Sequence, residues 1–108
     1  HVLTADTFGD AQANLVGIPC SPQVLPPGDQ AEGKQKFVQE LGPAVTVAVG
    51  NGRNDQLMLV TATLGIAVVQ TEGAAAATLM AADVVVPSIT AGLDLLLRPL
   101  RLAATLRT

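Results

Sequence analysis

Apolar and polar positions alternate along the chain in blocks that predict strands and helices in turn. The apolar, β-branched blocks that predict strands are residues 1–5, 23–25, 44–49, 64–69 and 83–86. Blocks with helical spacing or composition lie between and after them, at residues 7–16, 29–41, 54–62, 74–82, 89–97 and from 99 onward. This alternation predicts an α/β fold with a mostly parallel sheet and right-handed crossovers.

Helix-boundary residues support these limits. Asp6 is placed to cap the first helix, and Ser88 the helix at 89–97. Gly42-Pro43 ends the helix at 29–41, and Pro99 suits the first position of the last helix. The sequence therefore predicts where these helices begin and end, as well as which residues form them.

Composition narrows the class of protein. The chain has 108 residues, enough for one domain, and 49% of them are apolar, nearly all aliphatic. It holds two Phe and no Trp or Tyr, and its formal net charge is -3. Because nucleic-acid modules need stacking aromatics or a basic footprint, we expect no nucleic-acid partner. An aliphatic core suits buried parallel strands covered by helices.

The number of cysteines and the lengths of the apolar runs predict the cellular compartment of the protein. Cys20 is the single cysteine, so the chain has no internal disulfide, and a reduced, cytoplasmic setting is the simplest expectation. No apolar run reaches the length of a membrane span; the longest, 57–69, is interrupted by threonine and glycine. The sequence opens without a secretory leader. We therefore expect a cytoplasmic protein with no membrane association.

The most informative segment is residues 50–55, Gly-Asn-Gly-Arg-Asn-Asp, which follow the strand at 44–49 and precede a helix. Ligands of α/β sheets bind at the carboxyl ends of strands, and glycines there let the backbone approach a ligand closely. Asp55 offers a hard oxygen donor of the kind that Mg²⁺ takes. The alternative is a strand-to-helix turn that uses Gly and Asn only for their backbone freedom.

Two further polar residues are placed near strand ends. Thr4 ends the first strand beside a predicted helix start, where a hydroxyl can bind an anion; alternatively, Thr4 satisfies backbone groups and Asp6 only caps. Lys34 lies early in the helix before the strand at 44–49 and could serve as a phosphate counter-charge, or could be a solvated lysine. Lys36, two positions on, should face elsewhere.

Together these residues are parts that phosphoryl transfer requires: a hydroxyl, an ammonium group and a loop with a metal-binding carboxylate. In this order, Leu3-Thr4-Ala5-Asp6, then Lys34, then the 50–55 loop resemble the haloacid dehalogenase (HAD) superfamily. The closest likeness is to the soluble HAD phosphatases that are similar to the phosphorylation domain of P-type ATPases. It extends over essentially all of the chain.

The resemblance implies a fold and a role for each residue. It implies a three-layer, Rossmann-like, mostly parallel sheet with helices on both faces. Thr4, Ala5, Lys34 and Asn54 would bind the phosphoryl group, and Asp55 with Asn51 would hold Mg²⁺. Thr4, Lys34 and Asp55 would be the catalytic groups, and the partner would be a phosphorylated substrate of unknown identity. No cap domain is expected, because residues 17–28 are too few to form one.

Two departures from the family pattern concern activity. Asn51 stands where the ATPase loop has its first aspartate, so one negative charge is lost and metal binding should weaken. The family's nucleophilic aspartate lies on an earlier, central strand, and none of Asp6, Asp10 or Asp29 occupies such a context. Residues 1–108 are thus expected to form a single domain equivalent to the C-terminal two-thirds of the fold.

The absent strand predicts a gap between the strands at 1–5 and 44–49. Three arrangements would resolve it. A longer form of the protein carries the strand, which we favour; a second chain fills the gap by strand exchange or as a homo-oligomer; or the two flanking strands pair directly.

The functional hypothesis is a Mg²⁺-dependent phosphatase or phosphotransferase acting through an aspartyl-phosphate whose aspartate is not in this chain. The alternative is a catalytically inactive HAD-derived fragment that serves in assembly or regulation.

Overall fold

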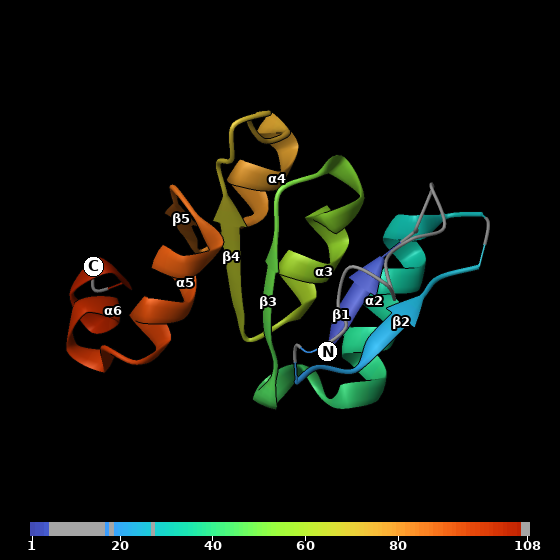
Figure 1. Ribbon diagram of the computed structural model, residues 1–108, viewed down its shortest axis with the longest axis horizontal. Coiled ribbons are helices and arrows are strands. Elements are labelled where there is room, and N and C mark those ends of the chain that lie inside the picture. Colours follow the sequence, from blue (N-terminus) through green and yellow to red (C-terminus); the bar gives the residue numbers. More distant parts are fainter. Residues whose placement is uncertain (5–16, 18, 27, 107–108) are drawn as a thin grey trace.

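The computed structural model describes residues 1–4, 17, 19–26 and 28–106, with Thr4 described by its backbone alone (Figure 1). The helix expected at 7–16, its cap Asp6, and Ala5 lie outside the described residues. The strands are β1 (Val2–Thr4), β2 (Pro22–Val24), β3 (Val47–Gly50), β4 (Leu64–Val68) and β5 (Val84–Val86). The α-helices are α2 (Gln30–Leu41), α3 (Gln56–Thr61), α4 (Ala76–Ala81), α5 (Ile89–Leu96) and α6 (Pro99–Leu106).

The five described strands pair only in parallel, as the alternation of strands and helices predicts. The strands form two separate sheets, one of β1 and β2 and the other in the order β3-β4-β5. The α/β class with mostly parallel pairing is therefore confirmed. Direct pairing of the segments 1–5 and 44–49 is wrong, because β1 pairs with β2 and β3 pairs with β4.

Helices pack on both faces of the three-stranded sheet (Figure 1). On one face, α2, α3 and α4 lie over β3 and β4, and their apolar side chains form a core centred on Val38, Met58 and Leu59. On the other face, α5 covers β4 and β5, around a second core that includes Ile66 and Val86. All five residues of β4 are buried, as expected of a central parallel strand covered on both sides.

The predicted helix boundaries agree closely with the structure. Asp29 caps α2 by accepting the amide N–H of Glu32, and Gly42 ends the helix at φ 102°, where a side chain would be strained. Ser88 caps α5 in the same way, through the amide of Ala91. Pro99 opens α6 at the first position, as its fixed φ favours.

The strand predicted at 44–49 is shorter and later than expected. Pro43–Val45 form a 3-10 turn, η1, and β3 begins only at Val47. The proline fixes a backbone φ that suits the turn, and the hydroxyl of Thr46 donates to the carbonyl of Gly42 at 2.7 Å. Local turn chemistry therefore overrides β-branched propensity at the start of this segment.

Gly65 in β4 is required by a close approach of α3. A Cβ atom built on Gly65 would lie 2.5 Å from the backbone carbonyl oxygen of Leu59. Main chain cannot move aside as the end of a flexible side chain can, so only glycine allows α3 to pack this near the sheet. Among the described residues, no helix is long and apolar enough to cross a membrane.

Gly65→Ala is expected to destabilise the fold by about 2 kcal/mol or more, because α3 must shift from the sheet. Gly33→Ala is the matched control. Gly33 lies inside α2, and a Cβ atom there would meet only side-chain atoms of Leu25, at the ordinary contact distance of 3.7 Å. That substitution should stabilise the protein by about 0.5–1 kcal/mol. Urea unfolding measures both. Equal effects of the two substitutions would contradict the packing argument.

Candidate functional site

The loop after β3 is organised around the carboxylate of Asp55. Arg53–Asp55 form a 3-10 turn, η2, that leads directly into α3 and returns the Asp55 side chain toward the end of β3. Its Oδ2 atom accepts the backbone N–H groups of Asn51 and Gly52, both at 3.0 Å. A Cβ on Gly50 would lie 2.5 Å from the Asp55 carboxyl carbon, so glycine is needed beneath the carboxylate.

Lys34 reaches this carboxylate from α2. Its Nζ atom lies 2.6 Å from Oδ1 of Asp55 and 3.1 Å from the amide oxygen of Asn54. The residue is only 8% exposed, so the interpretation of Lys34 as a solvated lysine is wrong. Lys36 is exposed, as the helical spacing predicts. The ion pair therefore joins α2 to the β3–α3 loop at the carboxyl edge of the sheet.

Three residues that sequence reasoning missed hold the loop from its other side. Thr78 of α4 is fully buried, and its hydroxyl donates to the carbonyl of Gly52 at 2.6 Å. The carbonyl of Asn51 accepts the backbone N–H of Ala75 at 3.0 Å. Glu72, just after β4, accepts the side-chain amide of Asn51 at 3.2 Å. The polar run at residues 70–72 could have pointed to Glu72, because it also follows the carboxyl end of a strand.

The structure places the predicted phosphate-binding residues as follows. Lys34 and Asn54 are hydrogen-bonded to each other beside Asp55. Thr4 ends β1, but its side chain and all of Ala5 lie outside the described part. An ammonium group has three N–H donors, and the contacts of Lys34 with Asn54 and Asp55 use two. Lys34 also lines the cavity described below.

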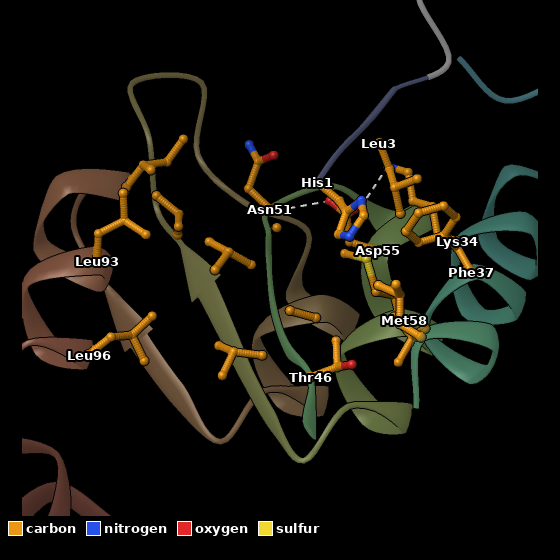
Figure 2. Close-up of a pocket in the computed structure, with 18 of the residues that line it drawn as sticks. His1, Leu3, Lys34, Phe37, Thr46, Asn51, Asp55, Met58, Leu93 and Leu96 are labelled. Carbon is orange, nitrogen blue, oxygen red and sulfur yellow. Dashed lines mark hydrogen bonds and ion pairs between the residues drawn. The ribbon is translucent and has the colours of Figure 1, made fainter. Parts of the chain in front are cut away.

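The predicted metal ligands, Asp55 and Asn51, do not converge. Both oxygens of Asp55 are engaged, one by Lys34 and one by loop amides. The side-chain amide of Asn51 is directed away from Asp55 (Figure 2). Its nitrogen donates to Glu72 and to the Gly73 carbonyl. Within the described ranges, no group of three acidic, histidine or cysteine side chains could hold a metal ion. These two residues alone therefore do not fit Mg²⁺, which takes about six oxygen ligands.

A cavity of about 700 Å³ opens beside this network (Figure 2). Asp55, Lys34 and Asn51 lie at its polar end, and apolar residues of β3, α2 and α5 line the rest. The described site thus combines a buried ammonium–carboxylate pair with a mostly apolar hollow at one edge of the sheet.

Comparison with known proteins finds a relative in the archaeon Methanocaldococcus jannaschii, the uncharacterized protein MJ0073. It is 43% identical over 84 residues, which span 74% of this chain and 90% of the relative. No protein-family model matches the chain, and no solved structure matches it.

Removing the Asp55 carboxylate should destabilise the protein strongly, because it leaves the Lys34 ammonium buried without a partner. Asp55→Ala is expected to lower the free energy of unfolding by about 3–5 kcal/mol. Asp94→Ala is the matched control, since Asp94 pairs with Arg98 and Arg101 on the exposed surface. Its cost should stay below about 1 kcal/mol. If urea unfolding shows similar losses of unfolding free energy for both variants, the buried Lys34–Asp55 pair stabilises the protein no more than a surface pair does.

A carboxylate at position 51 should strengthen Mg²⁺ binding. Asn51→Asp is expected to tighten Mg²⁺ binding by about tenfold or more, because it places a second anionic oxygen donor beside the carboxylate of Glu72, which accepts the Asn51 side-chain amide. Gln39→Glu adds the same charge at an exposed position of α2 and should leave binding unchanged. Titration with MgCl₂, followed by NMR or calorimetry, distinguishes the two. An equal gain in both variants would mean that net charge alone controls the affinity.

Proposed function

The chain belongs to the same family as the uncharacterized protein MJ0073, and we propose that it is the phosphoryl-binding part of a Mg²⁺-dependent phosphatase or phosphotransferase of the HAD type. The observation that carries this proposal is the buried Lys34–Asp55 pair at the carboxyl end of β3, hydrogen-bonded to Asn54. The order of the residues in the sequence and their meeting at one edge of a parallel sheet both support it.

In this proposal, Lys34 binds the phosphoryl group and Asp55 positions Lys34. The two acceptors fix the position of the ammonium group before a ligand arrives, and its third N–H would bind a phosphoryl oxygen. The Nδ2 group of Asn54 supplies further donors beside it. Thr4, at the end of β1, would add its hydroxyl, as the resemblance implies.

The charge balance of the site supports the proposed need for Mg²⁺. Asp55 neutralises the charge of Lys34, so little positive charge remains to balance a phosphoryl group, which carries about -1.5 to -2 near neutral pH. Mg²⁺, which the resemblance implies, would supply that charge when bound. Because Asp55 and Asn51 do not make a complete set of ligands, the remaining oxygens would come from the substrate, water or groups outside the described residues.

The chemical step that the resemblance implies uses an aspartate outside this chain. Its carboxylate oxygen would bond to phosphorus as the ester P–O bond breaks, and the leaving oxygen would take a proton to depart as an alcohol. Water would then attack the aspartyl-phosphate, releasing inorganic phosphate and restoring the carboxylate. Through both steps the role of Lys34 is to hold a non-bridging phosphoryl oxygen.

The test is binding of inorganic phosphate to the 108-residue chain in the presence of Mg²⁺, measured by calorimetry. We expect millimolar affinity that Lys34→Gln lowers by about tenfold, the effect of losing a charged hydrogen bond. Lys36→Gln is the control and should bind as the unmodified chain does. Circular dichroism establishes that each variant is folded, and Asn54→Ala, which leaves the ion pair intact, serves as a second probe if Lys34→Gln unfolds.

The same samples test the catalytic part of the proposal. Without the external aspartate, the chain should bind phosphate but not hydrolyse 4-nitrophenyl phosphate. Phosphate binding that is absent, or that is equally weakened by Lys36→Gln, would overturn the proposal and favour a HAD-derived fragment with a structural role. Turnover by this chain that survives Lys34→Gln would contradict the assigned role of Lys34.

A further inference from the structure

A smaller pocket adjoins the phosphoryl-binding site on the side of β4. Its volume is about 550 Å³, and its polar side chains are those of Asn51 and Glu72; glycine and alanine residues of the loops after β3 and β4 line the rest. We call it the side pocket. Asn51 also lines the larger cavity that contains Lys34 and Asp55. A ligand bound to Lys34 can therefore extend past Asn51 toward Glu72.

The hydrogen-bond donors of the side pocket are largely used within the chain. Four backbone N–H groups of its lining already donate to acceptors of the chain, those of Asn51, Gly52, Gly73 and Ala75. A side-chain amide has two N–H donors, and those of Asn51 bind Glu72 at 3.2 Å and the Gly73 carbonyl at 3.4 Å. An anion that entered the side pocket would therefore meet few free donors.

Acceptor oxygens of the side pocket, by contrast, are open to a ligand. Glu72 accepts the Asn51 amide through Oε1, and no described residue donates to its Oε2 or to Oδ1 of Asn51. Glu72 is exposed, and it forms no ion pair within the described ranges. Arg53, the cationic residue of the 50–55 loop, lines neither the cavity nor the side pocket. A negative charge and a second acceptor thus remain, and together they favour a cationic donor.

We propose that Glu72 determines the substrate class of the phosphoryl site by binding an ammonium group on the leaving alcohol of the substrate. The substrate is then a phosphomonoester of an amino alcohol, with its phosphoryl group at Lys34 and its ammonium group at Glu72 and the amide oxygen of Asn51. An ammonium group has three N–H donors and no acceptor, so it matches a pocket that offers acceptors. This inference rests on the proposed phosphoryl chemistry, and it gives Glu72 a role that the resemblance does not assign.

The test compares two phosphate esters of similar size that differ in one charge. 2-Aminoethyl phosphate carries the ammonium group, and propyl phosphate carries a methyl group in its place. Calorimetry with the 108-residue chain and Mg²⁺ measures both affinities. We expect 2-aminoethyl phosphate to bind about threefold to fivefold more tightly, the gain from one exposed ion pair. This preference should shrink at high salt, because salt screens exposed charges.

Glu72→Gln identifies the source of the preference. The substitution removes the charge but keeps a side-chain oxygen that can accept from Asn51, so the preference should disappear while inorganic phosphate binds as before. Glu40→Gln is the matched control, because it removes the same charge at an exposed position of α2, and it should retain the preference. Circular dichroism establishes that both variants are folded.

Three outcomes would overturn this inference while the phosphoryl site remains supported. The two esters could bind equally, the preference could survive Glu72→Gln, or Glu40→Gln could abolish it to the same extent. A chain that binds neither ester nor inorganic phosphate would instead overturn the proposed function, and this inference with it.

Discussion

The buried ion pair between Lys34 and Asp55 is the interaction on which the rest of the site depends. It joins α2 to the loop between β3 and α3, two segments about twenty residues apart in the sequence. Isolated charges in a protein interior are costly, so each member of the pair is stable there only because of the other. The same carboxylate also binds two loop amides, and so one side chain sets both the loop conformation and the position of the ammonium group.

The second constraint is the division of the strands into two parallel sheets. A parallel strand is normally buried among neighbours on both edges, yet β1 and β3 border a common hollow lined by apolar side chains. The polar network and the hollow adjoin each other at the carboxyl end of β3, where α/β folds bind ligands. Whatever occupies the hollow will therefore lie close to Lys34. In the functional proposal this is also where an external aspartate would have to enter.

Much of this architecture could be predicted from local signals. The cap at Ser88, the stop at Gly42 and the apolar run of β4 each depend on a few neighbouring residues, so they can be recognised without a structure. Asp29, predicted as the first helical residue, is instead the cap of α2. The 3-10 turn at Pro43–Val45 was missed because a β-branched run masked the turn chemistry. The sequence could not decide whether Lys34 is buried or solvated, because its burial depends on the packing of α2 against α3, which no local pattern reveals. The direction of the Asn51 side chain depends likewise on Glu72, twenty-one residues away.

The central claim is that the Lys34 ammonium, held by Asp55, is a phosphoryl-binding group. The most direct measurement is NMR of the lysine ammonium groups in ¹⁵N-labelled chain during titration with inorganic phosphate and Mg²⁺. We expect the signals of the Lys34 ammonium and the Asn54 side-chain amide to shift together and saturably, while the Lys36 signal stays in place. Signals of Lys34 that do not move at saturating phosphate, or a Lys36 signal that moves as far, would contradict it.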